Sequence, residues 1–336
     1  MIVLHLQDRL NLEHAVFDAV RNAFNDHHLP EPQLVANLAW HLPQRLRNSQ
    51  FAQLHLGVGS VFIHGQPLVH SPRFPKPSTK SVELGDLLLV RTLVQHGTPV
   101  ERRALMLQAK KSQKPTVKPD NENQWFLYER WPLFTYQRGK TLSGQCRHVR
   151  ERDMNRASQY LIITPPPSLS QWRCTSFTVT PFHNFTYCIP TLGHQTAHPT
   201  SPALSNYHDF TKTLVDFILG NAGKRFIYQP TNDIGWNQVV TDLLDVTSNS
   251  VSKFIGRAAS GGTLSRGIAL TPIKSRYFSH HAIATHHEDS AYVANLDGPP
   301  MDINPWPSDG DPEYEGISII EFVVGEMGEE QRYNLR

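Results

Sequence analysis

The chain has 336 residues, of which 39% are hydrophobic and 18% are charged. That length suits two domains or one large one, and the composition excludes a chain that is disordered throughout. No run of about 18 apolar residues is present, so we expect no membrane-spanning helix, and the first residues do not resemble a signal peptide. Three cysteines without CxxC spacing predict neither a disulfide framework nor a zinc knuckle, which favours a cytoplasmic protein.

The net charge of +2 hides an asymmetry along the chain. Residues 286–336 contain 12 acidic and 2 basic residues, whereas residues 1–285 contain 30 basic and 18 acidic ones. The window 91–156 alone has 14 basic and 6 acidic residues. Such a surplus attracts a polyanion, although a solvated surface would show the same composition. The acidic end is interpreted as a solubilising tail, as a screen for the basic face, or as a contact for a protein partner.

The first predicted element is a helix over residues 11–25, with Asn11 as its N-cap. At about 100° per residue its apolar side chains fall on one arc: Leu12, Val16, Ala19, Val20, Ala23 and Phe24. Glu13 lies within the same arc. A carboxylate directed at a core needs a partner, because burying an unpaired charge is costly, whereas an exposed first turn would leave Glu13 in solvent.

The strongest pattern is a hairpin of two apolar strands over 82–94 and 100–111. Their apolar central parts predict that both faces are covered. In an antiparallel hairpin the start of one strand lies beside the end of the other, so Asp86 should lie close to Gln108 and Lys110. The last two residues are two positions apart and share a face.

The other predicted elements alternate between helix and strand. They are a helix over 34–46, one or two strands over 53–63, a helix that begins in 120–138 and breaks at Pro132, a short polar helix over 151–160, a strand over 160–164, β-structure over 175–189, helices over 209–219 and 236–254, a loop over 258–267 and a strand over 316–324.

The polar end of the hairpin has the residue types that metal-dependent phosphodiester cleavage requires. Mg²⁺ prefers hard oxygen ligands, and Asp86 would supply a carboxylate and Gln108 an amide oxygen. Lys110 would reach the scissile phosphate or the attacking water, and Glu13 would hold a metal-bound water or a second metal. The alternative is an ordinary ion pair between Asp86 and Lys110, which contributes little if it is exposed.

At these residues the sequence resembles a known group. Gly85-Asp86 at a strand start, followed by the hairpin and Gln108-Ala109-Lys110, is similar to the PD-(D/E)XK nuclease superfamily, and more narrowly to its Mrr-like restriction endonuclease branch, whose second half-motif reads Q-x-K. The resemblance covers roughly the first half of the chain. It implies that Asp86 binds the metal, that Gln108 occupies the second acidic position and that Lys110 is the catalytic lysine.

The resemblance also implies that Glu13 is the helix carboxylate of the site. The sequence departs from the pattern in two places. Gln108 removes a charge from the metal site, which Glu13 or Glu83 would have to compensate, and Leu84-Gly85 precedes Asp86 without the proline of the motif name.

We therefore expect an α/β fold with a restriction-endonuclease-like mixed sheet flanked by helices and an α+β C-terminal half. The predicted division is a nuclease core over 1–190 and an accessory region over 191–336. The expected function is that of an endonuclease that uses Mg²⁺, or Mn²⁺, to cleave DNA in prokaryotic restriction or defence, with RNA as the alternative substrate. The alternative function is that of a catalytically inactive nucleic-acid-binding or regulatory subunit of a defence complex. Expected partners are DNA, a protein at the acidic end and a second copy of the chain, but no membrane.

Basic residues after the hairpin are predicted to contact phosphates: Lys111, Lys114, Lys118, Arg138, Lys140 and Arg147. The aromatic side chains among them either stack on bases or, more commonly, pack in a core: Trp125, Tyr128, Trp131 and Tyr136. Gln124 is a weaker candidate for the active site. The histidines within 280–287 are interpreted as part of a surface loop rather than a zinc site. Cys174 and Cys188 are interpreted as structural cysteines rather than as nucleophiles paired with His183.

Overall fold

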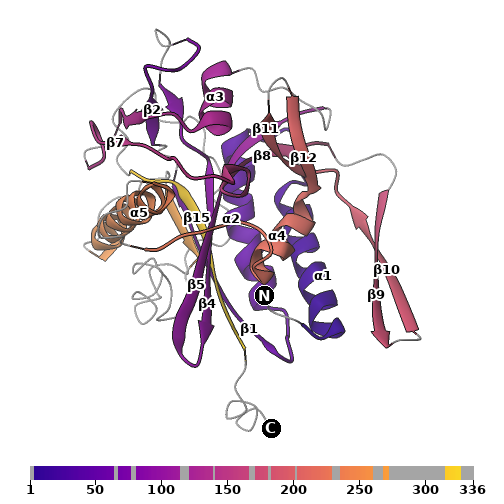
Figure 1. Cartoon of the computed structure of the whole chain (residues 1–336). Helices are drawn as coiled ribbons and strands as arrows, with labels where there is room; N and C mark the ends of the chain where they lie inside the picture. Colours follow the sequence, from indigo (N-terminus) through magenta and orange to yellow (C-terminus); the bar gives the residue numbers. More distant parts are fainter. Residues whose placement is uncertain are drawn as a thin grey trace.

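The computed structural model describes residues 4–63, 67–76, 81–113, 121–138, 141–165, 171–180, 183–200, 203–228, 235–259, 268–271 and 315–326. Its largest unit is a mixed sheet (Figure 1). The strands are β1 (Leu54–Ile63), β4 (Leu87–Gln95), β5 (Thr98–Lys111), β8 (Ser158–Ile163), β11 (Gln195–Thr200), β12 (Ala203–Asp209), β14 (Ile268–Thr271) and β15 (Ser318–Glu326). They lie in the order β12-β11-β8-β5-β4-β15-β1-β14, and the short β13 (Lys224–Arg225) also pairs with β5.

The centre of the sheet contains the predicted hairpin, in which β4 and β5 pair antiparallel, although its first strand begins at Leu87 and not at residue 82 as predicted. His96 and Gly97 join them, and both have positive φ, as in the two-residue turns that suit hairpins. Side chains alternate across a strand. Leu105 and Leu107 of β5 therefore pack in one core, and Met106 packs in the other. The prediction that both faces of the hairpin are covered is confirmed.

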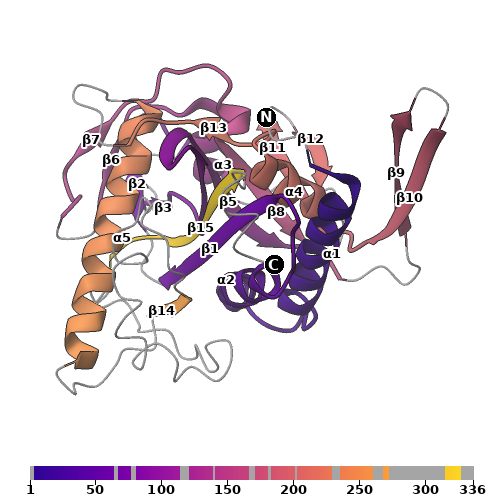
Figure 2. The same ribbon diagram turned by 90° about the horizontal axis from the view of Figure 1, so that it is seen from below.

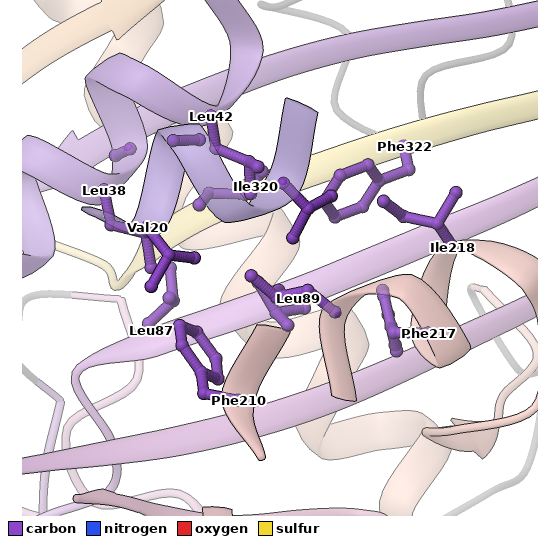
Figure 3. Packing of buried hydrophobic residues seen from close by; sticks show 14 of the residues in the cluster. Val20, Leu38, Leu42, Leu87, Leu89, Phe210, Phe217, Ile218, Ile320 and Phe322 are labelled. Carbon is purple, nitrogen blue, oxygen red and sulfur yellow. The ribbon is translucent and has the colours of Figure 1, made fainter. Parts of the chain in front are cut away.

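Three helices cover one face of the sheet: α1 (Leu6–Ala23), α2 (Glu31–Arg47) and α4 (Phe210–Leu219). Their apolar side chains meet those of the sheet in a single core (Figure 3). In this core Val20, Leu38 and Phe217 from the helices are buried together with Leu89 of β4 and Ile320 of β15. The predicted mixed α/β architecture, with helices flanking the sheet, is confirmed at this level.

The opposite face is covered by α3 (Glu122–Arg130), α5 (Trp236–Ala259) and a small sheet (Figure 2). The small sheet has the order β3 (Val82–Glu83), β2 (Leu68–His70), β6 (Phe134–Tyr136), β7 (Cys146–Arg147), and a single 3-10 turn, η1 (Met154–Arg156), precedes β8. The four aromatic side chains considered for base stacking are buried in the core of this face: Trp125, Tyr128, Trp131 and Tyr136. They are therefore packing residues.

The strands β9 (Gln171–Thr180) and β10 (His183–Thr191) form a separate two-stranded sheet that projects from the main body (Figures 1 and 2). Cys174 and Cys188 occupy opposed positions in this pair of strands. Among the described residues, none of the helices combines the length and apolar character that crossing a membrane requires.

Several helix predictions differ from the structure. The short polar helix predicted over 151–160 is wrong, since those residues form η1 and the start of β8, and α5 extends to Ala259 instead of ending at 254. α1 begins at Leu6, so the predicted N-cap is wrong; Asn11 lies inside the helix, where its side chain donates to the Gln50 carbonyl at 2.9 Å. α2 begins at Glu31, earlier than predicted, because Pro32 fits the first turn of a helix, where its missing N–H is not needed.

The predicted boundary after residue 190 does not divide the sheet. β11, β12, β14 and β15 all follow that boundary, yet they pair within the sheet that β1, β4 and β5 begin. β15 pairs antiparallel with β1 and parallel with β4, so a strand from the end of the chain occupies the centre. The second half of the chain thus completes the fold of the first, and the acidic residues 286–314 lie outside the described residues.

Candidate active site

The structure brings Asp86, Gln108 and Lys110 together at one end of the central hairpin. Asp86 directly precedes β4, and its N–H donates to the Leu107 carbonyl of β5 at 2.9 Å. Gln108 and Lys110 follow Leu107 along β5, and Lys110 is close enough to act electrostatically on the Asp86 carboxylate. The pairing of the two strands therefore positions all three functional groups.

The Asp86 carboxylate is held by two donors from β5. Its Oδ2 accepts from the Ala109 N–H at 2.7 Å and from Nε2 of Gln108. The same Nε2 lies 3.4 Å from Oε2 of Glu83. Gln108 is only 1% exposed, and its Oε1 is buried without a hydrogen-bond partner among the described residues. Gln108 thus joins the carboxylates of Asp86 and Glu83 through its Nε2, and the lone pairs of its Oε1 are unused.

The electrostatics of this cluster favour binding of a proton or a cation. Burial is the main cause that raises the pKa of Asp86 well above its usual value, and the neighbouring Glu83 carboxylate adds to the shift. Burial likewise raises the pKa of Glu83, and Lys110 opposes both shifts. Carboxylates that are desolvated and close together resist ionisation unless a positive charge joins them, an arrangement that is typical of functional sites.

Helix α3 supports the backbone that carries the carboxylates. Gly85 is needed there, because a Cβ at this position would lie 2.7 Å from Cγ of Met106 and 3.0 Å from the Tyr128 hydroxyl. That hydroxyl donates to the carbonyl of the residue before Gly85 at 2.9 Å. One turn earlier in α3, Nε2 of Gln124 donates to the Glu83 carbonyl at 3.4 Å. Gln124, a weaker candidate from the sequence, therefore lies beside the cluster.

The helix carboxylate at this end of the sheet is Glu31, the first residue of α2. Its Oε2 lies 3.5 Å from Nζ of Lys110, and its Oε1 accepts from the Lys111 N–H at 2.7 Å. Sequence reasoning missed Glu31 because the predicted helix began too late. The signal was present, since a glutamate followed by Pro32 is typical of the first turn of a helix.

Glu13, which the resemblance assigned to the site, pairs with a residue of its own helix. It lies within α1 and is 2% exposed, as its place among apolar residues predicts. Its Oε1 lies 3.2 Å from Nε of Arg9, one turn earlier in the same helix. The glutamate that contacts Lys110 is Glu31, because α2 rather than α1 begins where β5 ends.

A small cavity of about 10 Å³ adjoins Gly85 and Asp86. Pro32 and Val35 of α2 and Ser318 of β15 contribute to its walls. A cavity of this size holds about one water-sized group. The space beside Asp86 is therefore bounded by the same helix that carries Glu31.

The predicted phosphate contacts divide into two groups. Lys114, Lys118 and Lys140 lie outside the described residues, whereas Lys111, Arg138 and Arg147 lie within them. Lys111 is next to the cluster, and its Nζ donates to the Leu29 carbonyl at 2.8 Å. Arg147 binds Asp242 in bidentate fashion, at 2.6 and 2.9 Å, and its side chain is 15% exposed. Its guanidinium is thus committed to α5. The histidines of 280–287 lie outside the described residues.

The oxygen donors at this end of the sheet fit a hard divalent cation. Asp86 and Glu83 supply carboxylates and Gln108 supplies an unpartnered amide oxygen, which are the donor types that Mg²⁺ and Mn²⁺ prefer. Within the part of the chain that the structure describes, no three histidine, cysteine, aspartate or glutamate side chains group closely enough to hold a metal by themselves. The Gln108 amide faces the two carboxylates through Nε2, so its oxygen would join them as a ligand only after the amide turned over.

Comparisons with models of protein families, with curated proteins and with solved structures found no match for this chain. The chemistry of the site is therefore inferred from its own side chains.

Proposed function

We propose that the protein is a metal-dependent endonuclease that hydrolyses phosphodiester bonds in DNA and belongs to the Mrr-like branch of the PD-(D/E)XK nucleases, acting in restriction or defence. The observation that carries the proposal is the meeting of Asp86, Gln108 and Lys110 at the adjoining ends of β4 and β5. A carboxylate, an amide oxygen and a lysine in one place are the groups that hydrolysis assisted by a hard cation requires.

The path of the chain supports a restriction-endonuclease-like fold. β4 and β5 form the antiparallel hairpin, and β8 pairs parallel with β5 after the chain has passed through α3. α3 packs on one face of this unit and α2 on the other. In such a unit the C-terminal end of β5 lies beside the start of β4, and the first turn of α2, which carries Glu31, lies next to both.

Asp86, Glu83 and Gln108 would hold the cation. A bound divalent cation lowers the pKa of a bound water and polarises the phosphate. Lys110 is placed to stabilise the negative charge that develops on the phosphate oxygens, and Glu31 orients its ammonium group from α2 at 3.5 Å. Gln124 and Tyr128 keep the backbone around Asp86 in position from α3.

The test is incubation of the purified chain with plasmid and with single-stranded DNA and RNA in Mg²⁺, Mn²⁺ or EDTA. We expect DNA cleavage with either metal and none in EDTA. Asp86→Asn and Lys110→Ala should each reduce cleavage by about 100-fold or more, the scale for loss of a charge-stabilising group. Cleavage that persists in both variants would disprove the site.

Matched controls come from α4, where Lys212 and Asp216 form an exposed ion pair on the helix surface. Asp216→Asn and Lys212→Ala remove the same charges as the two test variants, away from the hairpin end. Both should cleave at the rate of the unmodified protein. Circular dichroism and thermal unfolding of all four variants establish that any loss of cleavage does not come from loss of the fold.

A second function, that of an inactive nucleic-acid-binding subunit, is favoured by one contact. Nε2 of Gln108 lies between the carboxylates of Asp86 and Glu83, so an amide group already joins the two acids. This function predicts DNA binding in EDTA with no cleavage in any metal. It also predicts that Lys110→Ala weakens DNA binding.

A further inference from the structure

A second hollow, away from the candidate active site, lies at the other end of α3. It is a cavity of about 620 Å³ between the end of α3, the turn η1 and the end of β11. Its lining includes the basic side chains Arg73, His148 and Arg150 and the acidic side chains Glu151 and Asp153. The cavity therefore presents both cationic and acidic groups.

The cationic part is formed by three side chains that converge. Nε of Arg150 donates to Nδ1 of His148 at 3.0 Å. Burial and the charges of Arg150 and Arg73 lower the pKa of His148. Arg73 and Arg150 are exposed, and no carboxylate among the described residues forms an ion pair with either of them. Two unneutralised guanidinium groups beside a neutral imidazole make a local positive potential that an anion would relieve.

The acidic groups of the cavity are mostly engaged elsewhere. Glu129 pairs with Arg130 at 3.6 Å, which leaves little net charge from these two residues. Oε1 of Glu151 accepts from the Trp236 N–H at 2.6 Å at the start of α5, whereas its Oε2 is buried without a partner among the described residues. Asp153 is exposed. An unsatisfied carboxylate oxygen accepts a hydrogen bond from a ligand hydroxyl or amine.

Backbone strain collects around the same cavity. Four non-glycine residues of the described chain have positive φ, and three of them line the cavity: Trp131 at 42°, Asp153 at 61° and Asn206 at 55°. Asn and Asp tolerate this region of backbone conformation, but a bulky Trp adopts it only at a cost in free energy. Strained residues that cluster around one hollow are typical of ligand-binding sites.

The cavity and the candidate active site are linked by α3. The first turn of α3 carries Gln124 at the active site, and its last residue, Arg130, lines the cavity. The loop that contains Arg73 continues to Lys76, whose N–H donates to Asn123 in that first turn at 3.0 Å. Helix α3 has 9 residues and is thus about 13 Å long. This length corresponds to about four phosphates of one strand along a DNA duplex.

We propose that this cavity binds one phosphate-bearing nucleotide, with the phosphate between Arg73, His148 and Arg150 and a hydroxyl or amine of the sugar or base at Glu151. Two sources share this chemistry: a nucleotide of the DNA strand several positions from the scissile bond, or a free mononucleotide. The first source rests on the proposed nuclease function, whereas the second does not.

The test uses the full chain in EDTA, so that binding is measured without cleavage. Fluorescence anisotropy with a short labelled DNA strand is compared for the unmodified protein, for Arg73→Ala/Arg150→Ala, and for the control Arg21→Ala/Arg45→Ala on the other face of the sheet. A second arm titrates His148 by NMR with and without adenosine monophosphate, and with inorganic phosphate alone. For the cavity variant only, we expect DNA binding to be about tenfold weaker. The slope of the logarithm of the binding constant against the logarithm of the salt concentration should also decrease in magnitude by about one or two.

Weaker DNA binding confined to the cavity variant supports the strand as the source. A rise in the pKa of His148 on addition of the mononucleotide, with DNA binding equal in all three proteins, supports the free nucleotide. Equal DNA binding together with no response of His148 to any probe would overturn the proposal. Glu151→Gln, which keeps the bond to the Trp236 N–H, should weaken mononucleotide binding without changing the response to inorganic phosphate. Since none of these measurements requires cleavage, failure of the nuclease function would leave them interpretable.

Discussion

Nζ of Lys110 lies 3.5 Å from the Glu31 carboxylate, and this pair joins the end of β5 to the first turn of α2. The second oxygen of Glu31 accepts from the Lys111 N–H at 2.7 Å, so the carboxylate is anchored to the backbone of the strand as well. A lysine with four rotatable bonds is thereby directed to the end of the hairpin where Asp86 lies. The packing of α2 against β5 therefore sets the position of the lysine that we propose to stabilise the transition state.

The first prediction compares the two glutamates on the N-terminal helices. Glu31→Gln removes the charge that orients Lys110, so cleavage should fall by about 10-fold to 100-fold. Glu13→Gln breaks the pair with Arg9 inside α1 and should lower stability without lowering the cleavage rate at a temperature where the fold persists. Initial rates on plasmid DNA and urea unfolding of both variants measure the two effects. A larger loss of cleavage for Glu13→Gln would restore Glu13 as the helix carboxylate.

The second prediction concerns the stability of the metal-free site. The pKa of Asp86 is raised in the folded chain, so folding disfavours its ionised form, and stability declines as the pH rises above the ordinary pKa of an aspartate. Asp86→Asn keeps an acceptor for the Ala109 N–H and removes the charge. It should raise the free energy of unfolding in EDTA at neutral pH by about 1 kcal/mol. Thermal unfolding measures the change, and Asp216→Asn on the surface of α4 should not show it.

The third prediction uses the neutral residue in the second acidic position. Gln108→Glu places a third carboxylate against Asp86 and Glu83, so it should destabilise the metal-free fold. The same charge should strengthen binding of Mg²⁺, and the variant should therefore gain more stability on addition of the metal than the unmodified protein does. Unfolding temperature against metal concentration tests both expectations. A variant that is destabilised but gains nothing from Mg²⁺ or Mn²⁺ would contradict the assignment of Gln108 as a metal ligand.

The fourth prediction is a pH dependence of stability that arises away from the site. His194 is 4% exposed, lies with its ring 4.9 Å from that of Phe24, and accepts from the Thr164 N–H at 3.3 Å. Burial, with a smaller contribution from His27, lowers the pKa of His194 to about 3. The unfolded chain therefore binds a proton below pH 6.5 that the folded chain does not.

Stability should consequently be complete above pH 6.5 and fall as the pH drops, by about 1.4 kcal/mol per pH unit until the pH nears 3. His194→Gln should show a shallower decline. Urea unfolding at several pH values measures the slope. His208→Gln, at an exposed position of β12, is the matched control and should leave the slope unchanged.

The fifth prediction concerns a buried charge in the hairpin. Arg91 of β4 is fully buried, donates to the Ile218 carbonyl at the end of α4 at 2.7 Å and lies 3.1 Å from Glu101. Arg91→Ala removes one partner of a buried pair and should cost about 3–5 kcal/mol of stability. Arg225→Ala removes an arginine from the same glutamate at a side chain that is 75% exposed, and should cost less than about 1 kcal/mol. Equal losses, measured by denaturant unfolding, would contradict this role of burial.

The hairpin could be predicted from the sequence because its signal is local. Two apolar strands joined by a short turn permit one antiparallel pairing, and that pairing alone places Asp86 beside Gln108 and Lys110. The five amphipathic helices were likewise predicted, with ends displaced by up to five residues, since the apolar positions repeat at helical spacing. The polar helix predicted over 151–160 had no such repeat, and that prediction was wrong. The aromatic residues of α3 are buried, in line with the expectation that they more commonly pack in a core than stack on bases.

Only the tertiary structure decided which distant segments meet. β15, near the end of the chain, pairs between β1 and β4. An apolar strand is stabilised where its backbone groups form hydrogen bonds and its side chains are buried, whatever the distance in sequence to its neighbours. The same holds for the glutamate of the site: both Glu13 and Glu31 lie on helices of suitable pattern, and only the packing of α2 against the end of β5 brings Glu31 to Lys110. Local periodicity determines the elements, whereas burial of apolar surface between elements that are remote in sequence determines their neighbours.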